Sequence, residues 1–309
     1  MVLASGLTDF ARDAVDLQVQ ADAVGLGAIF ALMAVGIGLV FGVLRLVNFA
    51  YGQLVMAGAF ALAYAAERGW PVAAGIALCV GVVLVLSLAM ERVVFRPLRE
   101  QSPAVMLIAT FAVSFLLQSV ALLWFGPLGK TATSLVELNR PVSLGGVEIR
   151  KISVVAILIA AVCLVLLVLL LGRTAIGLHM RAAALDFSTA RLLGVRANLV
   201  STAAVLVSGL LAAVVAVMLT VQFPTVTPTF ALQETILVLA GVVVGGMTRL
   251  VPATLGGFLI GYVSGLLGGA LPTNQSQYLP SFVFGLVVLV LLVRPGGLFT
   301  RGRGLVERV

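Results

Sequence analysis

Uncharged polar side chains within or beside long apolar stretches are the residues of this sequence whose chemistry stands out. They carry amide or phenol groups: Asn48, Tyr51, Gln53, Gln118 and Gln222. Such groups cost free energy in apolar surroundings unless they find hydrogen-bond partners. Each therefore either bonds a neighbouring helix or helps to line a pathway that is polar but holds no charge. Pro224 and Pro228, which interrupt helix continuation, follow the last of them.

Residues for catalysis or metal binding are not assembled in the same way. His179 is the single histidine, so neither a Ser-His-acid site nor a zinc site is expected. Residues 129–131 read Gly-Lys-Thr, but a phosphate-binding loop also needs a glycine at position 124, where Trp124 stands. We therefore expect no enzyme activity, no metal and no cofactor in this chain.

The composition indicates a protein that folds in lipid. Hydrophobic residues make up 61% of the 309 positions and charged residues 10%, against about 25% charged residues in soluble domains. Cys79 and Cys163 fall inside apolar runs and are expected to pack there. The net charge of +7 comes from arginines spread over short loops, which favours a role in membrane orientation and argues against a nucleic-acid partner.

Nine apolar runs are long enough to be considered as membrane spans, with a range of eight to ten. Their approximate bounds are 24–44, 49–66, 71–90, 104–125, 152–171, 199–221, 235–248, 250–271 and 278–293. None shows the alternation of a barrel strand, so the predicted fold class is all-α, a polytopic membrane protein. The run 235–248 is short and is compatible with a re-entrant segment.

The distribution of Lys and Arg predicts the orientation of these spans. With the amino terminus outside, most of the 19 basic residues lie inside. This divides the chain into an extracytoplasmic tail (1–23), a transmembrane domain (24–293) and a basic cytoplasmic tail (294–309). The acids of the chain lie outside the spans, and Glu234 only borders one. Ion-driven carriers usually keep carboxylates at mid-membrane, so energy for any transport is expected to come from another subunit.

One apolar run carries a glycine at every fourth position: Gly257, Gly261, Gly265 and Gly269. This spacing puts them on one helix face, where a neighbouring backbone can approach closely. Packing within the chain is the expected use, with a contact between subunits as the alternative.

The longest inside loop, 172–198, predicts a short helix between Met180 and Leu193 that Gly194 stops. Ala182 belongs to its small, apolar surface, and Arg181, Asp186 and Arg191 add polar groups. Such a helix either docks into a groove of another protein or rests on lipid headgroups.

Several stretches are similar to one known family: 25–32, 47–53, 177–182, 193–195, 245–246, 256–257 and 294–299. Residues 48–52 read Asn-Phe-Ala-Tyr-Gly and residues 180–182 read Met-Arg-Ala. In these motifs the chain resembles the permease subunits of branched-chain (hydrophobic) amino-acid ABC importers, a group that includes urea and amide permeases. Position 51 is Tyr where relatives often have His, so the preferred solute is left open among hydrophobic amino acids, urea and amides.

This resemblance implies that residues 180–194 form a coupling helix that inserts into a cytosolic ATPase. It also implies a location in the bacterial inner membrane and three kinds of partner. These are an identical or homologous permease, two ABC ATPase subunits that bind ATP and Mg²⁺, and an extracytoplasmic substrate-binding protein. An ion-driven carrier of small neutral solutes and a structural membrane subunit remain as alternatives.

Overall fold

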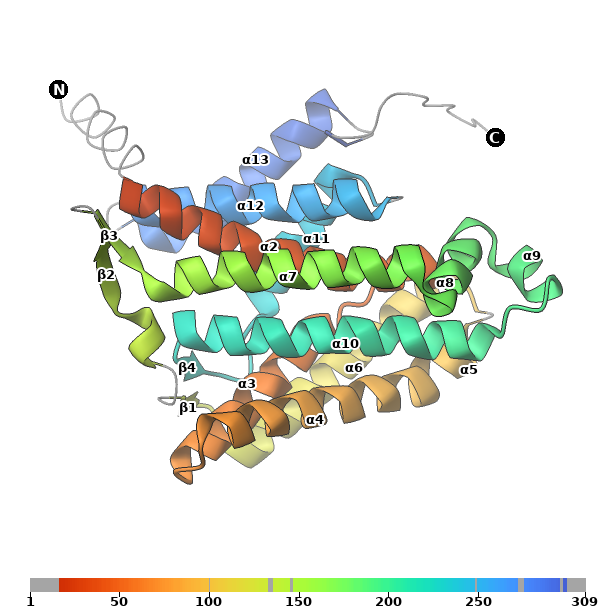
Figure 1. Ribbon diagram of the computed structural model, residues 1–309, viewed down its shortest axis with the longest axis horizontal. Coiled ribbons are helices and arrows are strands. Elements are labelled where there is room, and N and C mark those ends of the chain that lie inside the picture. Colours follow the sequence, from red (N-terminus) through yellow and green to blue (C-terminus); the bar gives the residue numbers. More distant parts are fainter. Residues whose placement is uncertain are drawn as a thin grey trace.

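The computed structural model describes residues 17–99, 101–132, 136–144, 147–247, 249–271, 275–294 and 297–298. The predicted all-α class is confirmed, since long apolar helices make up most of this part of the chain. They run side by side, with short strands at one end of the bundle and α8 and α9 at the opposite end (Figure 1). The amino-terminal tail is described only from residue 17, and residues 299–309 of the carboxyl tail lie outside the described residues.

Six helical segments among the described residues are long and apolar enough to cross a membrane. They are α2 (Leu17–Leu44), the continuous segment Val72–Leu98, α6 (Pro103–Phe125), α7 (Lys151–Arg173), α10 (Ala197–Gln222) and α12 (Leu250–Ala270). The segment Val72–Leu98 comprises α4 (Val72–Met90), a π-helical turn (Glu91–Phe95) and α5 (Arg96–Leu98). Three shorter helices match the other expected spans: α3 (Tyr51–Glu67), α11 (Leu232–Gly245) and α13 (Leu279–Val293). The total of nine crossings stays a prediction.

Short elements close the two ends of the bundle. At one end β1 (Lys130–Thr131) pairs antiparallel with β4 (Thr225–Val226), and β2 (Pro141–Leu144) pairs with β3 (Val147–Arg150). Two 3₁₀ turns, Val136–Asn139 and Ser276–Tyr278, complete the connections that the structure describes. At the other end lie α8 (Ala175–Leu185) and α9 (Phe187–Leu192). The β1–β4 pair joins the connection after α6 to the connection after α10.

The interior is built around α2 and α10. In their most apolar windows 83% and 72% of the residues are buried, against 17% to 22% in α4, α6 and α7. A helix that is apolar on every side and buried on every side belongs in the core of a bundle. The outer helices expose apolar side chains instead, as expected for surfaces that face lipid.

The glycine-bearing face of α12 lies against α2. A Cβ atom built on each of the four glycines would meet, in chain order, Ala34, Phe30, Ala23 and Val19 of α2. Because only hydrogen occupies these positions, the two backbones approach closely.

We expect Gly261→Ala to destabilise the protein by about 1–3 kcal/mol, because the added methyl group would meet Phe30 and the backbone of Gly27. Gly81→Ala on α4 is the matched control, since its Cβ would enter open space and alanine favours the helix. Unfolding of each purified variant in denaturing detergent measures the difference. Equal stability of the two variants would contradict the packing role of Gly261.

Candidate functional site

A cluster of buried polar side chains lies where α3 begins. Tyr51 and Gln53 are fully buried, and their side-chain polar atoms have no hydrogen-bond partner within the described part of the chain. The Tyr51 ring packs against Gly36, near the middle of α2. Asn48 is also buried, and its Oδ1 accepts a hydrogen bond from the Ala50 amide at 3.0 Å. The structure therefore brings three of the five predicted pathway residues, Asn48, Tyr51 and Gln53, to one place.

The start of α11 meets the start of α3 in this buried centre. Gly52 lies against the Ala231 carbonyl and the Thr235 side chain, so the two helices approach at their amino-terminal ends. Ala231 adopts a left-handed conformation (φ +61°) just before α11, and Thr235 Oγ1 donates a hydrogen bond to its carbonyl at 2.6 Å. Helix amino termini carry partial positive charge. At α11 this partial charge is offset by Glu234 in its first turn, whereas α3 has no acidic residue in its first turn and offers its amino terminus to an anionic group.

A cavity of about 790 Å³ opens between α2, α11 and α12 at the strand end of the bundle, and we call it the strand-end cavity. Its polar lining comes from seven residues: Gln18, Asp22, Arg150, Gln222, Gln233, Glu234 and Ser264. Leu26, Phe30 and Leu237 contribute an apolar wall. The volume lies within the range of small-molecule sites. Phe30 and Gly36 are six residues apart on α2, which places the buried centre about 9 Å further along that helix.

The remaining two predicted pathway residues are separated from the buried centre. Gln222 lines the strand-end cavity at the end of α10. Gln118 lies half-buried on α6 and is not part of the cavity lining. The five residues therefore do not form one continuous surface in this chain.

Charged residues of the cavity were not foreseen as part of a site. The Asp22 carboxylate accepts hydrogen bonds from Arg150 Nε at 2.8 Å and from the Ser153 hydroxyl. Glu234 lies in the first turn of α11 and faces the same cavity. Within the described residues α2 starts at Leu17, so Asp22 lies on this helix. Asp22 and Arg150 are far apart in the sequence, so no local signal connects them.

The expectation that every acid lies outside the spans is wrong for Glu91. The helix that was expected to end at residue 90 continues through a π-helical turn to Leu98, and Glu91 is only 1% exposed. Its Oε1 lies 3.7 Å from Arg99 Nη2. A buried carboxylate needs such a partner, and the residue directly after the continuing helix provides one.

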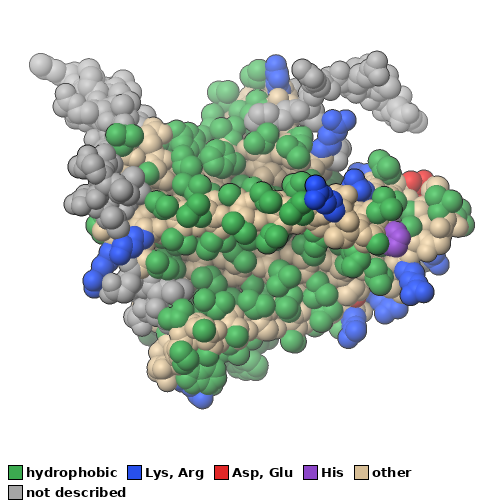
Figure 2. Space-filling model, in the orientation of Figure 1, with side chains coloured by type: hydrophobic (Ala, Val, Ile, Leu, Met, Phe, Trp, Pro, Cys, Tyr) green, Lys and Arg blue, Asp and Glu red, His purple; other side chains and the backbone are tan. Residues whose placement is uncertain are grey.

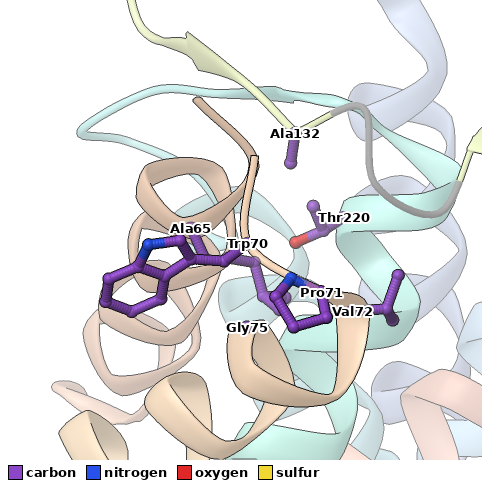
Figure 3. Close-up of a pocket in the computed structure, with 8 residues that line it drawn as sticks. Ala65, Trp70, Pro71, Val72, Gly75, Ala132 and Thr220 are labelled. Atoms are coloured by element: carbon purple, nitrogen blue, oxygen red, sulfur yellow. The ribbon is translucent and has the colours of Figure 1, made fainter. Parts of the chain in front are cut away.

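A smaller pocket at the turn between α3 and α4 is too small for a solute. Figure 3 shows Trp70 and Pro71 of this turn, with Thr220 of α10 and Ala132 at its other side. Its volume of about 10 Å³ is close to that of one water-sized probe. Thr220 already donates its hydroxyl to the Ala216 carbonyl.

The loop that was expected to hold one helix over 180–194 holds two. The first is α8, which ends at Leu185, and the second is α9, which ends at Leu192. Asp186 separates them and caps α9, because its carboxylate accepts hydrogen bonds from the Thr189 amide and hydroxyl. Gly194 follows α9 with a φ of +89°. The backbone amides of Gly194 and Val195 donate hydrogen bonds to the carbonyls of Arg191 and Ala190, respectively. This is a glycine helix stop of the kind that the sequence predicts.

The capping role of Asp186 at the start of α9 can be tested by substitution. Asp186→Ala should destabilise α9 by about 1 kcal/mol and raise hydrogen exchange of its backbone amides, because their capping acceptor is lost. Asp186→Asn is the control, since asparagine caps equally well. Unchanged exchange in the alanine variant would show that the cap does not hold α9.

α8 is fixed to the ends of two core helices. Met180 and Ala183 are buried in a cluster with Val43 of α2 and with Val200 and Ala204 of α10. In addition, Arg45, directly after α2, donates a hydrogen bond from Nη2 to the Ala184 carbonyl near the end of α8 at 2.7 Å. The spacing of apolar residues on α8 is typical of a helix that packs on one face, as Met180 and Ala183 do. The role of Arg45 was missed because its hydrogen bond joins residues 139 positions apart.

The opposite face of α8 is open to a partner. Arg181 is exposed there, and Ala182 beside it is half-buried. On α9, Arg191 is exposed, and Gly194 is exposed in the turn that follows. Basic side chains gather at this end of the molecule, around α8 and α9 (Figure 2).

Two solved structures share this fold. One is PsaBC from Streptococcus pneumoniae in complex with Fab, with 11% identity, 94% coverage of this chain, 97% of the other and a TM-score of 0.51. The other is an inward-facing conformation of a putative metal-chelate type ABC transporter, with 17% identity, coverage of 95% and 98%, and a TM-score of 0.50. At these identities the likeness concerns the fold alone.

Sequence relatives cover almost the whole chain. BraD, a high-affinity branched-chain amino acid transport system permease protein of Pseudomonas aeruginosa, is 30% identical over 95% of this chain and 98% of its own length. LivH, the protein described in the same terms in Escherichia coli K12, is 28% identical over 95% and 97%. Residues 21–292 match the family described as "Branched-chain amino acid transport system / permease component". The chain therefore belongs to the family of permease components of branched-chain amino acid transport systems.

Proposed function

We propose that this chain is a non-catalytic permease subunit of an ATP-driven importer of branched-chain amino acids. It forms half of the translocation pathway and pairs with a second permease, identical or homologous. Two ABC ATPase subunits, which bind ATP and Mg²⁺, dock at the α8–α9 end and supply the energy for transport. This end faces the cytoplasm. A substrate-binding protein delivers the solute at the strand end, on the side of the amino terminus.

One observation carries this proposal: α2 and α10 contact α8 at one end of the bundle and line the strand-end cavity at the other. Any displacement of α8 is therefore passed along two rigid helices to the cavity wall. Packed helices transmit such shifts because close-packed interfaces deform little. In this proposal Arg181, Ala182, Asp186, Arg191 and Gly194 belong to the docking surface for the ATPase.

The chemistry of the cavity supports an amino acid as the solute over urea or a simple amide. A branched-chain amino acid is a zwitterion with an apolar side chain. Asp22, Arg150 and Glu234 supply charges of both signs, and Leu26 and Leu237 supply an apolar wall. The amino terminus of α3, which has no acidic residue in its first turn, then offers partial positive charge to the carboxylate deeper in the protein. Tyr51 and Gln53 supply polar atoms at that depth.

The test is uptake of radiolabelled leucine into proteoliposomes that contain the complex purified from native membranes. We expect uptake to require three components. These are the ATPase subunits, ATP on the side of the membrane where those subunits lie, and the binding protein on the opposite side. Urea and acetamide serve as competitor solutes. Leucine uptake that needs no ATPase, or a purified complex that holds no amino acid on its binding protein, would overturn the proposal.

A second candidate function is an ion-driven carrier. It is favoured by two acidic residues, Glu91, which is buried, and Glu234, which lines the strand-end cavity. Such carriers bind their coupling ion on intramembrane carboxylates. Proteoliposomes that contain the permease but no ATPase subunits, placed under a proton or sodium gradient, test it directly. Uptake driven by the gradient alone would support the carrier.

A further inference from the structure

A second polar cavity, of about 740 Å³, lies at the α8–α9 end and is distinct from the strand-end cavity. It sits between α5, the turn after α9 and the start of α10. Four arginines line it: Arg96, Arg99, Arg191 and Arg196. Pro97, Val195, Asn198 and Leu199 complete the lining, which contains no acidic residue among those the structure describes. We call this cavity the four-arginine groove.

The floor of the groove is held in place by Arg99. Its Nη1 donates a hydrogen bond to Asn198 Oδ1 at 3.2 Å, which connects the end of α5 to the first turn of α10. Its Nη2 lies 3.7 Å from Glu91 Oε1, behind the groove. This carboxylate offsets part of the charge of the Arg99 guanidinium. The first turn of α10 adds the partial positive charge of a helix amino terminus.

The groove lies where the lipid-facing surface ends. Val85 and Val93, on the helical segment that leads to Arg96, are 66% and 73% exposed. Leu199 lines the groove and is 43% exposed at the start of α10. Apolar surface that faces hydrocarbon therefore reaches directly to a cluster of guanidinium groups. A small soluble anion would satisfy the charges and leave the adjoining apolar surface without a partner.

We propose that the four-arginine groove binds the headgroup of an anionic phospholipid, with its phosphate among the guanidinium groups. Its acyl chains lie along the exposed apolar side chains of the segment ending in α5 and of α10. Arginine forks match phosphate geometry, and basic pockets between helix ends at a membrane boundary suit anionic headgroups. Because Arg191 belongs to α9, the lipid bridges α5 to the element proposed to dock the ATPase. Coupling would then depend on membrane composition.

The test uses the full-length chain, purified in detergent, with bound lipid counted by native mass spectrometry during titration with phosphatidylglycerol or phosphatidylcholine. We expect wild-type protein to prefer phosphatidylglycerol. The variant Arg96→Gln/Arg196→Gln should bind it about 25-fold more weakly, because each arginine near an anionic surface contributes about a fivefold gain in affinity. The control Arg92→Gln/Arg173→Gln removes the same charge from the same end of the bundle, outside the groove lining.

Four results would overturn the proposal. Equal binding of the two lipids would show that charge plays no part, and equal weakening in the control would show a diffuse field instead of a site. Displacement of the lipid by millimolar inorganic phosphate would indicate a soluble anion. Release of the lipid when ATPase subunits are added would indicate that the groove belongs to the protein interface. None of these measurements requires transport, so they stand apart from the test of the proposed function.

Discussion

Arg181→Glu should reduce ATP-driven uptake and association with the ATPase by about 30-fold or more, while the permease itself stays folded. Arg181 is exposed on α8, whereas its neighbours Met180 and Ala183 hold the helix against α2 and α10. The substitution therefore changes the docking face and leaves the packed face intact. Loss of a buried charge partner at an interface costs about 2–5 kcal/mol, and about 1.4 kcal/mol corresponds to a tenfold change in affinity.

Two measurements separate this expectation from misfolding. Recovery of ATPase subunits with tagged permease reports docking, and size-exclusion profiles of the permease alone report its folding. Arg173→Glu is the control, because Arg173 is exposed at the end of α7 at the same end of the bundle. Normal uptake by Arg181→Glu would remove Arg181 from the coupling surface, and equal losses in both variants would point to bulk charge.

Arg99→Met should produce the largest loss of stability, about 3 kcal/mol, because it leaves the buried Glu91 carboxylate without its ion partner. The double variant Glu91→Gln/Arg99→Met should recover most of that loss, since no uncompensated charge then remains. A double-variant cycle of unfolding free energies in denaturing detergent measures the coupling. If the single and double variants are equally unstable, the ion pair does not explain the burial of Glu91.

The membrane-spanning character of the chain was predictable because it depends on local properties. An apolar run long enough for the hydrocarbon layer must satisfy its own backbone hydrogen bonds, and a helix does this within the segment. The Gly194 stop is equally local, since it depends on one residue that tolerates a left-handed conformation. The break at Asp186 was missed although residues 186–189 read Asp-Phe-Ser-Thr, which are weak helix formers, and Asp186 is a residue type that caps a new helix.

The predicted pathway residues divide according to sequence distance. Asn48, Tyr51 and Gln53 are neighbours in the chain, so the start of one helix keeps them together. Gln118 and Gln222 have the same chemistry, but the first lies half-buried on α6 and the second lines the strand-end cavity. Their positions depend on which faces of α6 and α10 turn inward, and hydropathy does not report this when a helix is apolar on every side.

Sequence alone determined that the chain is a helical membrane protein and where most of its helices lie, because the thickness and polarity of lipid act on each segment separately. Only the tertiary structure decided which distant groups meet. It paired Asp22 with Arg150 and Arg99 with Asn198, brought the start of α11 to Gly52, and joined α8 to α2 and α10. The physical reason is that these contacts link segments far apart in the chain, and packing of the whole bundle selects them.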